Sequence, residues 1–213
     1  MNPSSTTSSI RPPRTHALTL ASFAMAVALL VMLSNQFLDP KIAVQMHLDQ
    51  QAKINQVLPK SYYDNDPSKY LYHLHLKNGQ TIHYFLATKT GLPSAVILKA
   101  TAQGYSGAIH LLIAIDTHGI LTGVRVLSHH ETPGLGDKIE ADKSPWILQF
   151  KGLSLHNPPL GQWKVQKDGG HFAQFTGATI TPRGVVKAIK NNLQMFARYH
   201  DQLLNPKEDH HVR

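Results

Sequence analysis

The chain of 213 residues contains no cysteine. This absence excludes thiol redox chemistry, zinc sites with cysteine ligands and iron–sulfur clusters held by cysteine. Any redox activity of the chain must therefore come from a bound organic cofactor.

Acidic residues are also few, because 13 Asp and Glu stand against 21 Lys and Arg, which gives a formal net charge of +8. The basic residues are scattered, and no basic run interleaved with aromatic residues occurs outside the chain ends, so nucleic acid is not predicted as a partner. Pairs of carboxylates are scarce, and the sequence lacks a Gly-x-Ser-x-Gly elbow, a phosphate-binding loop with Lys and a His-Glu-x-x-His motif. The chain is therefore not expected to catalyse a reaction alone.

Long hydrophobic runs are limited to one segment, residues 16–38, which consists mostly of apolar or small residues. Its length is that of a single transmembrane helix, for which about 20 residues are needed. Arg11 and Arg14 precede the run and Asp39 follows it, which predicts a cytoplasmic N-terminus and a periplasmic main domain at the inner (plasma) membrane. A cleaved signal peptide is the alternative, but residues 34–38 are too bulky for the usual cleavage site, so an uncleaved anchor is favoured.

The rest of the chain can be divided into segments by its composition. Residues 1–15 are rich in Ser, Thr and Pro and are expected to form a disordered cytoplasmic tail. Residues 39–59 predict an amphipathic helical stalk. The main domain is expected over residues 60–204, followed by a polar tail at 205–213.

Alternating apolar residues predict two strands at 70–76 and 81–86, joined by a two-residue turn at Asn78-Gly79. Further strands are predicted at 95–100, 108–115 and 120–127, a short helix over 146–150, and one more strand at Trp163-Lys164-Val165. Strands and helices do not alternate along the chain. We therefore expect an α+β fold with an antiparallel sheet and flanking helices, rather than a doubly wound dinucleotide fold.

Histidines occur in two groups that could suggest a metal. His73 and His75 share one face of a predicted strand, and His129-His130 precede Glu131. A solvated strand face and an ordinary loop explain these positions without a metal, because acidic partners are lacking near the first group. No metal site is predicted.

The run from Thr176 to Pro182 precedes a strong helix pattern. Thr181 is predicted as the N-cap and Pro182 as the first helical residue. The apolar positions that follow share one helix face: Val185, Val186, Ile189, Leu193 and Phe196. Thr179 then lies at a helix N-terminus, where unpaired N–H groups favour a phosphate, although the run could also simply cap the helix.

Two blocks of residues resemble a known family. The run Gln174–Thr181 resembles the flavinylation motif of the FMN-binding subunits of the Rnf/Rsx and Na⁺-NQR respiratory complexes, in which a threonine is esterified through the FMN phosphate. The block Ser128–Ile139 is similar to the flavin-side loop of the G subunits of Rnf/Rsx complexes. The resemblance implies that Thr179 is the acceptor. Ala173 stands where such motifs usually carry an acidic residue, and the nearest upstream acid is Asp168.

The resemblance further implies a set of cofactor-binding residues in two segments. By itself the loop at 131–136 could be an ordinary turn, but its glycines would also let the backbone approach a flat flavin, with Leu135 packed on the ring and Thr132 or backbone N–H groups at its polar edge. The full set is Thr179 as covalent acceptor with Thr176, Gly177, Ala178, Thr181, Glu131, Thr132, Gly134, Leu135 and Gly136.

By this resemblance the chain is a redox subunit of an ion-translocating oxidoreductase complex that relays electrons through covalent FMN. Its partners would be the other membrane and peripheral subunits of the complex and a flavin transferase. A membrane-anchored flavin-binding sensor or assembly protein, and the equivalent subunit of Na⁺-NQR, are the alternatives.

Overall fold

The computed structural model describes residues 14–76, 79–206 and 210–212, with the backbone alone for 14–16, 31, 33–48 and 210–212. The chain divides into two units, Met1–Met46 and His47–Arg213. The expected N-terminal tail lies almost wholly outside the described residues, as does part of the expected C-terminal tail.

Helix α1 (Arg14–Val57) begins in the first unit and ends in the second. It covers most of the residues for which the sequence predicted a membrane helix (16–38) and a helical stalk (39–59). In its first part the large apolar side chains are exposed: Leu18, Leu20, Phe23, Met25, Val27, Leu29, Leu30 and Met32. Among the described residues, no helix offers a stretch that is both long and apolar enough to cross a membrane. The predicted span, residues 16–38, falls partly on residues whose side chains are not described.

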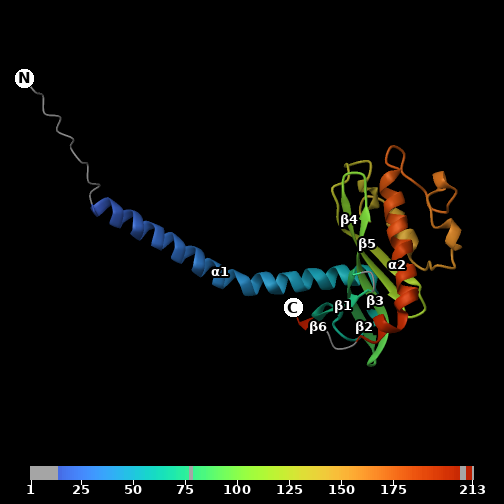
Figure 1. Ribbon diagram of the computed structural model, residues 1–213, viewed down its shortest axis with the longest axis horizontal. Helices are drawn as coiled ribbons and strands as arrows, with labels where there is room; N and C mark the ends of the chain where they lie inside the picture. Colours follow the sequence, from blue (N-terminus) through green and yellow to red (C-terminus); the bar gives the residue numbers. More distant parts are fainter. Residues whose placement is uncertain (1–13, 77–78, 207–209, 213) are drawn as a thin grey trace, which may run out of the picture. The chain divides into compact units, whose positions relative to one another are not determined.

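The second unit contains an antiparallel sheet of six described strands in the order β5-β4-β3-β2-β1-β6 (Figure 1). The strands are β1 (Tyr70–His75), β2 (Thr81–Lys89), β3 (Leu92–Gln103), β4 (Ala108–Asp116), β5 (Leu121–Ser128) and β6 (His210–Val212). The antiparallel sheet with flanking helices confirms the predicted α+β class. Strand β6 pairs with β1, although the sequence assigned its residues to a polar tail.

The turn between β1 and β2 is one residue longer than predicted. The Leu76 N–H donates to the Gln80 carbonyl (2.8 Å) and the Gly79 N–H donates to the Leu76 carbonyl (3.0 Å), so three residues separate Leu76 from Gln80. Gly79 has φ +82°, the left-handed conformation that closes a three-residue hairpin loop. Asn78 lies outside the described residues.

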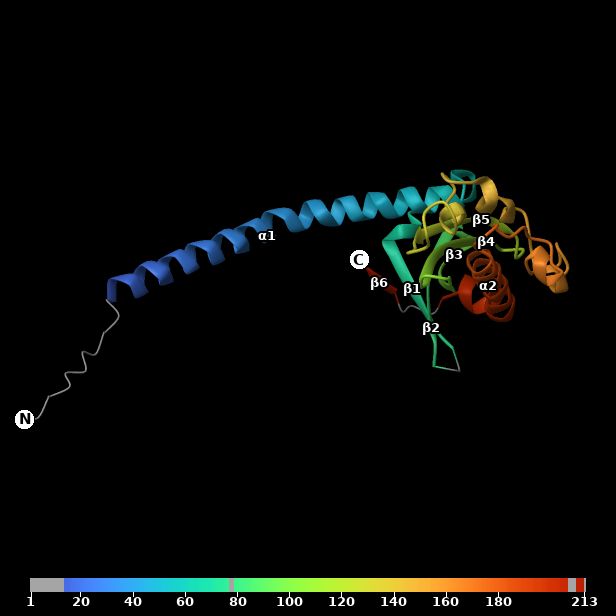
Figure 2. The same cartoon turned by 90° about the horizontal axis from the view of Figure 1, so that it is seen from above.

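The two faces of the sheet are covered by different helices (Figure 2). Helix α2 (Ile180–Leu204) covers one face, and the side chains that predicted its apolar stripe are all buried. We call the core beneath it the α2-face cluster; its members include Val96, Leu98, Ile109, Leu111, Ile113, Phe150, Trp163, Phe172, Val185, Ile189, Leu193 and Phe196. The α1-face cluster on the other side consists of Ile54, Val57, Leu58, Leu71, Phe85, Ala87, Ala95, Ile97, Leu112 and Ala114. Neighbouring residues of a strand alternate between these clusters, as the pleat requires.

Short 3₁₀ helices connect the regular elements: η1 (Lys60–Tyr62), η2 (Pro67–Lys69), η3 (Asp137–Ile139), η4 (Pro145–Phe150), η5 (Leu160–Gln162) and η6 (Gln166–Asp168). Helix η4 confirms the helix predicted over 146–150. The predicted strand at Trp163-Lys164-Val165 is wrong, because the backbone there makes only an isolated bridge from Val165 to Phe172. Trp163 and Val165 are instead buried in the α2-face cluster. A loop that inserts alternate side chains into a core has the same sequence pattern as a strand.

Candidate functional site

The start of helix α2 differs from the prediction. Thr179 is the N-cap residue, but its side chain makes no capping hydrogen bond. Thr181, which the sequence predicted as the cap, lies in the first turn and is fully buried, and its hydroxyl donates to the carboxylate of Glu131. The prediction failed because the long-range partner of Thr181 is 50 residues away and invisible to local sequence patterns.

Glu131 is only 5% exposed, and its carboxylate accepts hydrogen bonds from two other segments of the chain. The backbone N–H of Ser106 donates to Oε1 (2.8 Å), the N–H of Tyr105 donates to Oε2 (3.3 Å), and Thr181 donates its hydroxyl. A buried carboxylate is costly unless such donors satisfy it. Glu131 therefore joins the β3–β4 loop, its own loop and the first turn of α2.

Gly104 and Gly136 have no side chain, and this makes room for the Glu131 carboxylate. A Cβ atom on Gly136 would lie 2.9 Å from Oε2 of Glu131, and one on Gly104 would lie 2.9 Å from its Cδ. Both distances are too short for a real side chain. The glycines are thus required for close packing around Glu131.

The loop after β5 is a tight turn, as the plain interpretation of its sequence predicted. The N–H groups of Leu135 and Gly136 donate to the Thr132 carbonyl at 3.1 and 3.0 Å. The turn presents the Leu135 side chain to the surface, where it is 41% exposed. An exposed leucine beside polar backbone can contact an apolar ligand.

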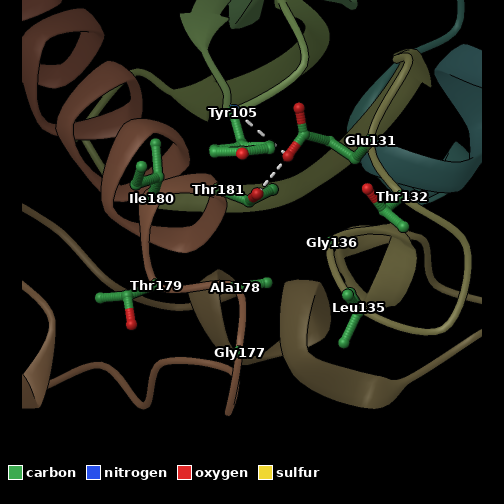
Figure 3. Close-up of a pocket in the computed structure, with 10 residues that line it drawn as sticks. All are labelled: Tyr105, Glu131, Thr132, Leu135, Gly136, Gly177, Ala178, Thr179, Ile180 and Thr181. Atoms are coloured by element: carbon green, nitrogen blue, oxygen red, sulfur yellow. Dashed lines mark hydrogen bonds between the residues drawn. The ribbon is translucent and has the colours of Figure 1, made fainter.

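A cavity of about 250 Å³ lies between this turn and the start of α2 (Figure 3). It is lined by Tyr105, Glu131, Thr132, Leu135, Gly136, Gly177, Ala178, Thr179, Ile180 and Thr181. Eight of the ten residues predicted from the sequence line it, whereas Thr176 and Gly134 do not. Tyr105 and Ile180 were missed. Tyr105 lies in a Gly-Tyr-Ser-Gly loop, and an aromatic residue between turn glycines was the available signal.

The segment leading into Thr179 is also a turn. The Ala178 N–H donates to the Phe175 carbonyl (3.1 Å), and Gly177 has φ +81°, which favours glycine at this position. Ala173, which replaces the usual acid, is exposed, and its carbonyl accepts from the indole N–H of Trp146 (2.8 Å). The motif is therefore held by its backbone.

An ion pair braces the first turn of α2. The Arg183 guanidinium donates to both oxygens of Asp168, at 2.7 and 2.8 Å. This hydrogen-bonded pairing lowers the pKa of the Asp168 carboxyl and raises the pKa of Arg183. The pair is exposed, so we assign it little weight in stability.

The histidines do not converge. Nδ1 of His73 lies 2.7 Å from Nδ1 of His83 across β1 and β2, and His129 pairs with Glu140. Within the described part of the chain, no group of three or more His, Cys, Asp or Glu side chains could hold a metal ion.

Comparison with known proteins assigns this region to a family. Residues 104–194 match the FMN-binding domain model. A protein of Vibrio vulnificus, named as the G subunit of an ion-translocating oxidoreductase complex, is 41% identical over 196 residues, covering 90% of this chain and 93% of that protein. A protein of the same name from Cereibacter sphaeroides is 43% identical over 194 residues, covering 91% and 89%. The chain belongs to this family of G subunits. Every residue that lines the cavity falls within the matched FMN-binding domain.

A solved structure was also found, that of Shewanella oneidensis NqrC. It shares 23% sequence identity with this chain at a TM-score of 0.46 and covers 68% of this chain and 72% of its own.

Proposed function

We propose that this protein is a membrane-anchored redox subunit of an ion-translocating electron-transport complex, with FMN held in the cavity and esterified to Thr179. One observation carries the assignment of Thr179. Thr179 lines the cavity and its side chain makes no capping hydrogen bond, whereas the hydroxyl of Thr181 donates to Glu131. The Thr179 hydroxyl is therefore available for a phosphodiester.

The lining residues fit such a ligand. The start of α2 supplies backbone N–H groups and a partial positive charge toward a phosphate at Thr179. Leu135, Ala178 and Ile180 supply apolar surface for a flat ring, and Thr132 supplies a polar group. Bound FMN would contribute the one-electron and two-electron redox chemistry that this cysteine-free chain lacks.

A covalent tether also agrees with the small size of the cavity. At about 250 Å³ it falls below the range of roughly 300–1,000 Å³ for small-molecule sites, so it encloses a ligand only in part. Enclosure alone would hold such a ligand weakly. Attachment to Thr179 keeps the cofactor in place while one edge stays accessible for electron exchange with neighbouring subunits.

Membrane anchorage is part of the same proposal. The run of exposed apolar side chains on the first part of α1 would be buried by lipid, and Arg11 and Arg14 would remain in the cytoplasm. The domain would then lie in the periplasm. A phosphatase fused after Arg213 should be active, and a membrane-derived peptide containing Met1 should be recovered. An inactive reporter would reverse the orientation, and a mature N-terminus near Asn35 would identify a signal peptide.

The decisive experiment compares Thr179→Val with Thr176→Val, both co-produced with a flavin transferase. Wild-type protein and Thr176→Val should show flavin fluorescence in a denaturing gel and the intact mass of an FMN adduct, because Thr176 is exposed and does not line the cavity. Thr179→Val should show neither and should still fold. Retained fluorescence in Thr179→Val would refute the assignment.

The role as an electron relay is tested in membranes. Thr179→Val should abolish electron transfer between the cytoplasmic donor of the complex and NAD⁺ while the other subunits remain assembled. Wild-type turnover would favour the flavin-binding sensor or assembly protein instead.

A further inference from the structure

Tyr105 is an aromatic residue with a fixed backbone and a free ring. Its N–H donates to the Glu131 carboxylate, and the N–H of Gly104 donates to the Gly107 carbonyl (2.8 Å), which closes the loop. The side chain is nevertheless 72% exposed. Aromatic rings next to a cavity are usually buried, because covering their faces removes a large apolar area from water.

The position of Tyr105 is tied to that of the proposed attachment site. The carboxylate that holds its backbone also accepts from Thr181, two residues after Thr179. The β3–β4 loop and the start of α2 are thus anchored to the same buried group. A shift of the Tyr105 backbone relative to the first turn of α2 would have to break these hydrogen bonds.

Tyr105 lies across the cavity from Leu135. Figure 3 shows the two side chains on opposite sides, with Thr181 and Ala178 between them. Leu135 and Ile180 are also exposed, at 41% and 45%. Three segments therefore each present an uncovered apolar side chain to one cavity, an arrangement that a flat apolar ligand between them would bury.

We propose that Tyr105 is a positioning residue that packs its ring on the face of the flavin opposite Leu135. The inference rests on the proposed occupancy of the cavity by FMN, but not on Thr179 as the tether. Tyrosine and leucine would hold the isoalloxazine between them, so the tethered cofactor keeps one orientation toward its redox partners.

The test uses a property of the ring itself. A phenol ring in contact with an excited flavin donates an electron to it and quenches its fluorescence, which a leucine cannot do. In the full-length flavinylated protein, Tyr105→Leu should raise the fluorescence yield and lifetime of the native protein several-fold. Tyr105→Phe, which keeps the ring but is harder to oxidise, should retain the position of the flavin absorption bands with weaker quenching.

The matched control is Tyr62→Leu, which changes a tyrosine packed against the α1-face cluster on the other side of the sheet. It should leave the fluorescence unchanged. Covalent loading is measured separately in denatured samples, so a lost tether is not mistaken for lost stacking. Equal lifetimes in wild type and Tyr105→Leu at equal loading would overturn the proposal and assign the exposed ring to another role.

A second arm is independent of the tether. Thr179→Val protein is titrated with lumiflavin, which has the ring system without the phosphate. Quenching of lumiflavin should be stronger with Tyr105 than with Leu at this position. If the wild-type protein fails to load FMN covalently but lumiflavin quenching depends on Tyr105, only the proposed attachment at Thr179 is refuted. Lumiflavin quenching that is the same with Tyr and Leu at position 105 would refute the stacking.

Discussion

The two faces of the sheet are both closely packed, but they serve different purposes. On the α1 face, mainly aliphatic side chains such as Ile97 and Leu112 pack against the end of α1. On the α2 face the core is larger and aromatic-rich, with Phe172 5.1 Å from Trp163 and 4.8 Å from Phe150 between ring centroids. All residues lining the cavity come from the first turn of α2 or from loops joined to it. One face can therefore be altered for stability alone, while changes on the other also alter the site.

The strongest effect should come from a pair of glycines, one on each face. A Cβ atom on Gly184 would collide with the backbone carbonyl of Gln103 under α2, and one on Gly123 would lie 2.6 Å from the Val57 carbonyl at the end of α1. The gain in backbone propensity from alanine is about 1 kcal/mol, whereas overpacking against immobile backbone costs about 3 kcal/mol or more. Both Gly184→Ala and Gly123→Ala should therefore destabilise the domain in urea unfolding.

The two variants should differ in flavin content. Gly184→Ala would displace the helix that begins at the proposed attachment site, so flavin per folded molecule should fall sharply. Gly123→Ala should keep it near the wild-type level. Equal loss of flavin from the two variants would show that changes on the α1 face of the sheet also alter the site.

A second pair compares buried threonine hydroxyls. Thr181 donates to Glu131 on the α2 side, and Thr122 donates to the Val57 carbonyl (2.9 Å) on the α1 side. Replacement by valine keeps the shape and removes the donor, which should cost about 1.5–3 kcal/mol at Thr181, where the acceptor is charged, and about 1 kcal/mol at Thr122. Only Thr181→Val should also shift the flavin absorption bands. A shift in Thr122→Val would contradict the comparison.

A smaller effect is expected at Ala173, where the family motif usually has an acid. Because the side chain is exposed, Ala173→Asp should fold normally and should accept flavin at an equal or faster rate. The rate is followed by in-gel fluorescence over time. Ala197→Asp, on the exposed side of α2, is the control and should not change the rate. Slower attachment in Ala173→Asp would count against the alignment of the motif.

The weakest effect concerns pH. The Asp201 carboxylate, followed by the Thr117 carbonyl, raises the pKa of His200 above its ordinary value of 6.5. A raised folded-state pKa contributes stability that is present below pH 6.5 and is lost as the pH rises through the raised value. The unfolding midpoint of His200→Gln should therefore change less with pH than that of the wild type just above pH 6.5. The exposed position makes this difference small, and an identical pH profile would remove any role for the pair.

Local sequence patterns were sufficient to predict most of the strands and helix α2. Apolar runs bounded by turns predicted β3, β4 and β5, whose central residues are buried on both faces of the sheet. The spacing from Val185 to Phe196 predicted the buried stripe of α2, because burial of one helix face imposes a period of about 3.6 residues. The same reasoning failed at Trp163 and Val165, since a loop can also bury alternate side chains.

The resemblance of the 131–136 and 176–181 segments to a known family predicted ten residues from the sequence, and eight of them line one cavity in the folded chain. The different roles of Thr179 and Thr181 follow only from the tertiary structure. The hydroxyl of Thr181 donates to Glu131, which is 50 residues away in the sequence but lies beside the first turn of α2. The side chain of Thr179 makes no capping hydrogen bond. The same carboxylate brings Tyr105 to the cavity. Hydrogen bonds between distant segments leave no periodicity in a sequence, so only folding reveals which groups they join.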